Sequence, residues 1–177
     1  MKYSSEHFEI TKRFWSGTKD GKSLSIEDEK CRIVAINRAI NDLMARTLTP
    51  TGAEGKFRTA VIDPLRNKLD EWFQRPEENV SEESFDTWHN ESCEVVLEFL
   101  NKYYSNDKEG KVSVQYGKAQ KIVNMTMKGL YCLKGADAYE KHFKYCHIAL
   151  DSFTLEWCQR NILTPQENAR AYLASML

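Results

Sequence analysis

The spacing of apolar residues is the feature of this chain that most restricts its fold. These residues recur every third or fourth position and almost never alternate, which is the period of an amphipathic α-helix. One such series reads Phe57, Val61, Leu65, Leu69, Trp72 and Phe73. Similar series cover residues 81–103, 112–133 and 136–157. We therefore expect an all-α fold.

Local signals predict where the helices begin and end. Ser25 is expected to cap a first helix that carries Ile33, Ile36 and Ile40 on its core face. Pro64 predicts a kink or a restart within the second helix. Thr164-Pro165-Gln166-Glu167 combines an N-cap, a proline at the first helical position and a capping-box glutamate, so a last helix is expected there. The prediction is about six helices in one compact domain, residues 1–177, with residues 1–24 as an irregular or short-helical lead-in.

Composition excludes several classes of protein. The 177 residues are 41% hydrophobic and 29% charged, which is typical of a folded globular domain and not of a disordered one. No apolar run approaches the ~20 residues of a membrane span, and the polar N-terminus has no secretory signal, so no membrane partner is expected. The five cysteines are odd in number, widely spaced and without a C-x-x-C pair. They are expected to be free thiols in a reducing cytoplasm.

Charge is distributed unevenly along the chain. The net charge is -1, yet residues 76–100 hold eight acidic side chains and no Lys or Arg, whereas residues 101–144 hold nine Lys against four acids. Solvated helix faces would account for both blocks. In a functional interpretation, the basic block binds a polyanion, and the acidic block is a surface that imitates or repels nucleic acid.

The predicted helix of residues 112–133 carries an unusual polar row. Gln120, Asn124 and Lys128 follow one another at intervals of four, and residues 112–136 include no acid. Asn is a poor helix former unless its amide is used. Two interpretations stay open: a buried amide network, to which Asn37 and Asn41 of the first helix would contribute, or a row of donors that contacts nucleic acid or a partner protein. The predicted contact residues are Lys118, Gln120, Lys121, Asn124 and Lys128.

Part of this helix resembles a known pattern. Gly117-Lys118-Ala119-Gln120-Lys121 followed by Asn124 is similar to the G-x-A-Q-K-x-x-N helix of small all-helical bacterial and phage-related proteins of unassigned function. In those proteins a segment like Cys146-His147-Ile148-Ala149-Leu150-Asp151 follows downstream. The resemblance covers about a quarter of the chain and carries no activity with it. It implies that Gly117, Gln120, Lys121, Asn124, His147 and Asp151 belong to one constellation.

Candidate catalytic and metal-binding residues are few. His142 and Cys146 stand four residues apart, but zinc usually takes four ligands in tighter pairs, so no metal and no cofactor are expected. His147 and Asp151 are also four apart, a spacing at which a carboxylate can orient an imidazole as a general base. No nucleotide-binding loop, dinucleotide fingerprint or zinc-protease motif is present.

These observations predict a binding protein more readily than an enzyme. The leading hypothesis is a non-enzymatic protein that engages nucleic acid or a nucleoprotein through the Lys/Gln/Asn-rich helix face. A second is a phage or mobile-element inhibitor of a host nucleoprotein defence system, similar to an anti-CRISPR protein, whose acidic helix mimics DNA. A third is a metal-independent ribonuclease that uses His147 and Asp151. The 20 aromatic residues, eight Phe, eight Tyr and four Trp, also leave room for a homo-oligomer interface.

Overall fold

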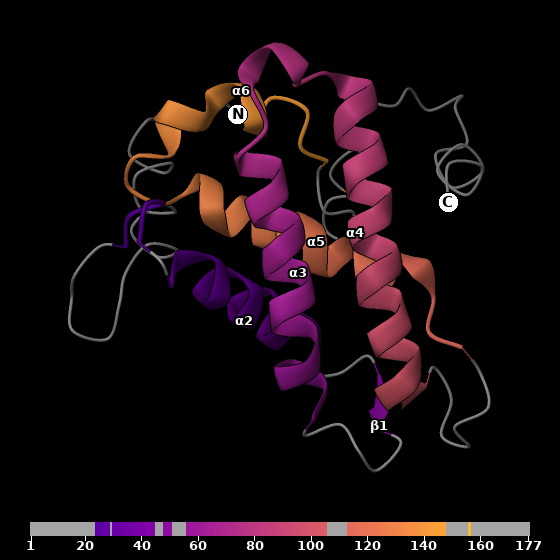
Figure 1. Cartoon of the computed structure of the whole chain (residues 1–177). Helices are drawn as coiled ribbons and strands as arrows, with labels where there is room; N and C mark the ends of the chain where they lie inside the picture. Colours follow the sequence, from indigo (N-terminus) through magenta and orange to yellow (C-terminus); the bar gives the residue numbers. More distant parts are fainter. Residues whose placement is uncertain are drawn as a thin grey trace. The chain divides into compact units, whose positions relative to one another are not determined.

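Figure 1 shows the computed structural model of the chain, which describes residues 24–28, 30–44, 48–50, 56–105, 113–147 and 156. The chain divides into two compact units, residues 1–147 and 148–177, and only Glu156 of the second is described. The elements of the first unit are α2 (Cys31–Met44), β1 (Thr49–Pro50), α3 (Phe57–Phe73), η2 (Glu77–Asn79), α4 (Glu82–Tyr103), β2 (Tyr104–Ser105), α5 (Tyr116–Tyr131), η3 (Ala136–Tyr139) and α6 (Glu140–Phe143).

The expected all-α fold is confirmed. The described part holds five α-helices where about six were predicted for the whole chain. The predicted last helix, from Thr164, lies outside the described residues. Among the described helices, none is both long and apolar enough to cross a bilayer.

Four helices pack around one another in the first unit. α5 lies against α2 and α4, and α3 lies against α4 and α2. In Figure 1, α3 and α4 run side by side and cross α5. Two strands of two residues each pair in antiparallel register. β1 lies within the connection between α2 and α3, and β2 directly follows α4. Sequence periodicity did not predict these strands, because a strand of two residues is too short to show an alternating pattern.

The core is aromatic where α3 meets α4. The rings of Trp72 and Trp88 stack at 5.2 Å between centroids, and Phe85 meets Trp72 edge to face. Each indole N–H donates to a backbone carbonyl: Trp72 to His142 at 3.1 Å and Trp88 to Lys68 at 2.7 Å. Both large side chains are therefore buried without leaving an unpaired donor. The buried face of α3 matches the predicted series from Phe57 to Phe73.

The start of the first helix differs from the prediction. α2 begins at Cys31, six residues after Ser25. The hydroxyl and amide of Ser25 instead close a turn with Glu27 and Asp28, because the chain here pairs with Lys134: Ile26 N–H donates to the Lys134 carbonyl at 2.9 Å. Gly135 follows with φ = +82°, a conformation that favours glycine, and turns the chain into η3. A long-range contact thus replaces the expected cap.

The other helix boundaries show which local signals prevailed. α3 continues as one helix through Pro64, so the helix does not restart there, which was one of the two predicted outcomes. α4 begins as predicted near Ser81, whose hydroxyl accepts from Ser84 N–H at 3.1 Å while the Ser84 hydroxyl accepts from Ser81 N–H at 2.9 Å. The series expected from Ala136 to Trp157 is helical through η3 and α6 to Phe143, and residues 148–155 and 157 are not described.

The described cysteines are free thiols. Cys31, Cys93 and Cys132 are buried, and Cys146 is half-buried. Cys158 lies outside the described residues. No disulfide links the four described positions, so the packing of the helices accounts for the first unit without a covalent staple.

Candidate functional site

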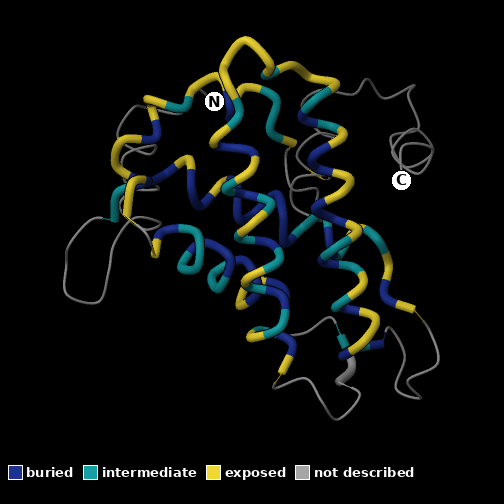
Figure 2. The backbone as a smooth tube through the Cα atoms, in the orientation of Figure 1, coloured by how far each residue is buried: buried dark blue, intermediate teal, exposed yellow. Residues whose placement is uncertain are grey.

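The middle of the predicted polar row is inside the protein. Residues 122–127 of α5 are all buried, because α2 and α4 cover the helix from two sides (Figure 2). Asn124 is 8% exposed, and its amide oxygen lies 2.8 Å from Nε2 of the fully buried His89 on α4. This geometry matches the buried-network interpretation for Asn124, which therefore is not part of an exposed contact surface.

The His89 ring connects this buried amide to the surface. His147 stacks edge to face on His89 with centroids 4.5 Å apart, and on Phe85 at 5.2 Å. Nε2 of His147 lies 2.9 Å from the carboxylate of Asp86, and both side chains are nearly half exposed. The polar series Asn124–His89–His147–Asp86 thus runs from the core to solvent. It brings together two residues of the resemblance, Asn124 and His147, while Asp151 lies outside the described residues.

Burial governs the protonation of this cluster. It lowers the pKa of His89, and the neighbouring His147 lowers it further, while the bond to Asn124 opposes the shift. Cys93 lies beside the His89 ring, with Sγ 3.8 Å from Nδ1, and its burial raises the thiol pKa to about 12. The thiol stays protonated at neutral pH, so Cys93 and His89 do not form an activated thiolate–imidazole nucleophile. The cluster offers one accessible acid–base pair, His147 with Asp86.

The remaining residues of the predicted row are dispersed. Lys121 is half-buried and its ammonium lies 3.5 Å from the carboxylate of Asp42 on α2. Lys118 is half-buried, which lowers its pKa. Gln120 is half-buried and Lys128 is exposed. Their role in partner binding stays a prediction, with the buried Asn124 interrupting the row between them.

The two α2 amides singled out in the sequence face α3 and not the row on α5. The amide oxygens of Asn37 and Asn41 each lie 2.7 Å from the guanidinium of Arg58. Sequence spacing did not predict this contact, because it joins positions 17 and 21 residues apart on different helices.

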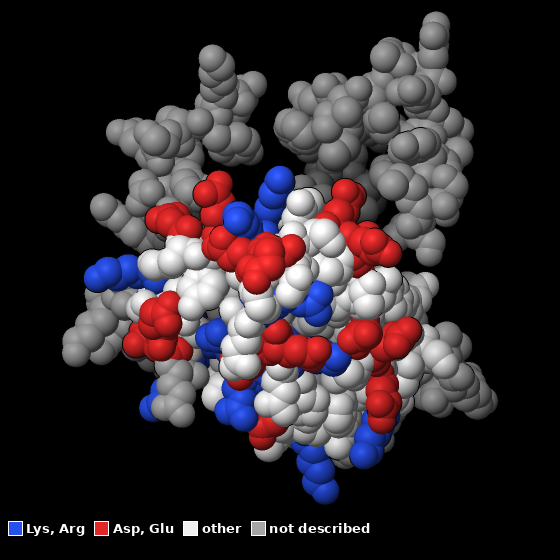
Figure 3. Space-filling view, turned by 45° about the horizontal axis from the view of Figure 1, so that its top comes forward, with Lys and Arg blue, Asp and Glu red and all other residues white. Residues whose placement is uncertain are grey.

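A row of exposed carboxylates lies on α4. At 100° per residue, Glu83, Glu91, Glu94 and Glu98 fall within an arc of about 80°. All four side chains are exposed, and we call them the acidic face. Figure 3 shows acidic and basic side chains interspersed on the face that it draws. Lys68 pairs with Glu91 at 2.7 Å, whereas Glu83, Glu94 and Glu98 have no ion-pair partner among the described residues.

A polar hollow opens beside the acidic face. It measures about 350 Å³ and lies between α3 and α4, and its lining includes Glu71, Arg75, Glu83 and Glu91. Lys68 bridges Glu71 at 3.4 Å and Glu91, which raises the pKa of its ammonium. The carboxylates at this hollow therefore come from both α3 and α4, with Lys68 and Arg75 as the cations beside them.

The histidine considered as a metal ligand is used otherwise. His142 is buried, with Nε2 2.9 Å from the carbonyl of Arg75 and the ring packed against Trp72 and Phe73. Across the described ranges, no group of three His, Cys, Asp or Glu side chains is placed to hold a metal ion.

No family model matches the chain, and no match was found among curated proteins or solved structures. The resemblance noted for residues 117–124 and 146–151 therefore stands on those residues alone.

Proposed function

We propose that this chain is a non-enzymatic binding protein whose acidic face engages the nucleic-acid-binding surface of a partner protein. The observation that carries the proposal is the set of exposed carboxylates on α4, three of them without a cation in the described part of the chain. A protein surface that binds nucleic acid is rich in Lys and Arg, so a rigid row of carboxylates complements it.

The spacing of the carboxylates supports this mimicry. Glu82 and Asp86 flank the acidic face, so six carboxylates occupy residues 82–98 of one helix. At 1.5 Å per residue this stretch is about 24 Å long, with one charge every ~5 Å. One strand of DNA presents a phosphate about every 3.4 Å. The helix thus approaches the linear charge density of a single strand on a scaffold that keeps its shape.

Helix stability alone does not account for this pattern. Glu82 and Glu83 lie in the first turn of α4, where they complement the helix dipole. Glu94 and Glu98 lie in the second half of the same helix, where the dipole gives an acid no advantage. No Lys or Arg occurs in α4 before Lys102 to pair with them. Their carboxylates are therefore available to an external cation.

The acidic face fits the described structure better than the basic row does. Asn124, at the centre of the row, is buried, and Lys121 already contacts Asp42. Direct nucleic-acid binding through α5 stays a proposal that would rest on Lys118, Gln120 and Lys128. The acidic face needs no rearrangement of the helices to be reached.

Affinity capture from a native lysate tests the proposal. We expect the tagged chain to retain nucleic-acid-binding proteins at about 50 mM salt and to lose most of them at 500 mM, because exposed charges are screened. The variant Glu83→Gln/Glu94→Gln/Glu98→Gln should lose this capture. Glu140→Gln, at an exposed position on α6, is the matched control and should retain it. Equal capture by all three proteins would contradict the proposal.

One observation favours a second candidate function. His147 is hydrogen-bonded to a carboxylate and accessible, as a general acid–base residue requires, although its partner in the structure is Asp86. A metal-independent ribonuclease is the corresponding proposal. Incubation with end-labelled RNA in the presence of a chelator tests it. Cleavage that disappears in both His147→Ala and Asp86→Asn would support it, whereas no cleavage by the wild type, or equal cleavage by the variants, would end it.

A further inference from the structure

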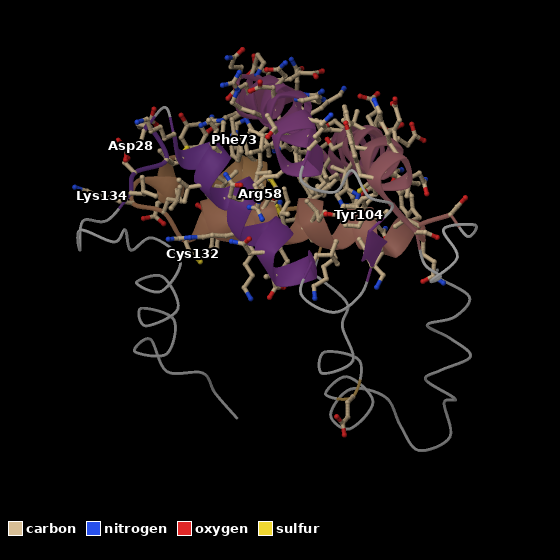
Figure 4. All side chains as sticks on the ribbon, turned by 90° about the horizontal axis from the view of Figure 1, so that it is seen from below. Asp28, Arg58, Phe73, Tyr104, Cys132 and Lys134 are labelled. Atoms are coloured by element: carbon tan, nitrogen blue, oxygen red, sulfur yellow. The ribbon has the colours of Figure 1, made fainter. Side chains whose placement is uncertain are left out.

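We infer that Arg58 is an anion-binding residue that accepts a phosphate group at the junction of α2 and α3. Its guanidinium is held by the amides of two α2 residues: Nη1 lies 2.7 Å from Asn37 Oδ1 and 3.3 Å from the Asn37 carbonyl, and Nη2 lies 2.7 Å from Asn41 Oδ1. Figure 4 shows Arg58 against α2. This inference goes beyond the proposed function, since it concerns another surface and another ligand.

The orientation of the amide that holds Nη1 is fixed by a second bond. Nδ2 of Asn37 donates to the carbonyl of Ile33 at 2.9 Å. Its oxygen must then point away from α2 and toward Arg58. The guanidinium is thus positioned before any ligand arrives, which reduces the conformational entropy that binding would cost.

No described residue neutralises the positive charge of Arg58. All three oxygens that contact it belong to neutral amides or to the backbone, and it forms no ion pair with a described residue. The arginines Arg32 and Arg66 differ, because they pair with Asp70 and Asp63. Nε of Arg58 has no hydrogen-bond partner among the described residues, and the side chain is only half-buried.

The two α2 side chains that hold Arg58 are amides and not carboxylates, which bears on the charge left for a ligand. Aspartate at position 37 or 41 would have the same shape and would form an ion pair with Arg58, which joins two helices more strongly than a neutral contact. Asparagine orients the guanidinium and leaves its charge available to a ligand. The amide of Asn41 is exposed, so its N–H groups can add donors at the same place.

The surrounding charges also favour an anion. Arg58 lies in the first turn of α3, where there is no acidic residue, and the N-cap residue Lys56 makes no side-chain cap bond. Two cations at the positive end of a helix dipole are unfavourable, and a bound anion would offset this cost. Two described acids of α2 and α3 contact other cations: Asp42 contacts Lys121, and Asp63 contacts Arg66.

The chemistry of the site points to phosphate. A guanidinium presents planar, parallel N–H donors that match two oxygens of a phosphoryl group. The phosphate could come from a free nucleotide or from a nucleic-acid strand. Titration of the full chain with pyrophosphate, ATP and a labelled 12-nucleotide single strand distinguishes the two, because a nucleotide site binds the first two probes and a strand site binds the third more tightly.

Three variants make the test decisive. Arg58→Gln removes the charge, and we expect it to weaken binding of the preferred probe at least about tenfold. Asn41→Asp keeps Arg58 but neutralises it, so it should weaken binding by a similar factor while the urea midpoint is unchanged or higher. Arg66→Gln makes the same substitution two turns later in α3 and should change binding less than about twofold.

Opposite results would overturn the inference. The inference is wrong if the wild type binds none of the probes, if Arg66→Gln loses as much binding as Arg58→Gln, or if Asn41→Asp binds as tightly as the wild type. The Asn41→Asp variant guards against misfolding as an explanation, because it is predicted to fold at least as stably as the wild type. Failure here leaves the acidic face on α4 untouched, and failure of the acidic face leaves Arg58 untouched, since the two sets of variants share no residue.

Discussion

Replacement of Asn124 by alanine tests whether the polar row on α5 is a contact surface or part of the core. Asn124 is 8% exposed and its oxygen lies 2.8 Å from His89 Nε2, while His89 is fully buried. Removal of the Asn124 amide leaves the buried His89 Nε2 without this partner, which should lower the free energy of unfolding by about 1–3 kcal/mol. With a urea slope of about 2 kcal/mol/M for a protein of this size, the unfolding midpoint should fall by about 0.5–1.5 M.

The matched control is Gln120→Ala, which removes an amide one turn earlier from a half-exposed position of the same helix. It should change the free energy of unfolding by less than about 0.5 kcal/mol. A double-mutant cycle with His89→Ala should give a coupling energy of about 0.5–3 kcal/mol, because the two residues are in contact. Equal midpoints for Asn124→Ala and Gln120→Ala, or additive effects in the cycle, would refute the buried-network assignment.

Three further predictions concern the same helices. Burial holds the folded-state pKa of His89 below its usual 6.5, so the unfolded chain takes up the proton first as the pH falls. The free energy of unfolding should therefore decrease below about pH 6.5. His89→Gln should flatten this pH dependence in urea titrations from pH 7.5 to 5. Ser81→Ala removes the capping box of α4 and should cost about 1 kcal/mol by thermal or urea unfolding, and an unchanged midpoint would contradict the cap. Cys93, with its pKa of about 12, should resist iodoacetamide in the native state and react after unfolding, as peptide mass spectrometry can measure.

Periodicity predicted the helices well because α3 and α4 each bury one face. The series Phe57 to Phe73 is the buried face of α3. For α5 periodicity predicted the helix but left the burial of its polar row open, because α5 is covered from two sides and a residue opposite the main apolar arc is also buried. The run of six residues from Ile122 to Met127 without a charge was a signal of this environment. His89, too, falls on the apolar series of α4 between Phe85 and Cys93, and could have been assigned to the core.

Other parts of the candidate site were beyond the reach of local patterns. His147 pairs with Asp86, 61 residues earlier, and Arg58 pairs with two residues of another helix. Such contacts depend on how helices pack, which spacing within one helix does not encode. The displaced start of α2 has the same origin, because the contact of residues 24–26 with Lys134 outweighs the capping preference of Ser25.

Displacement of DNA shows whether the acidic face occupies a nucleic-acid-binding surface. A nucleic-acid-binding protein captured by the tagged chain is loaded with fluorescent duplex DNA, and the anisotropy is followed as untagged chain is added. Wild type and Glu140→Gln should release the DNA with the same midpoint, and Glu83→Gln/Glu94→Gln/Glu98→Gln should need at least about ten times more protein. Retention of the DNA at saturating wild type, or release by the triple variant at the wild-type midpoint, would contradict the assignment of the acidic face as the binding surface.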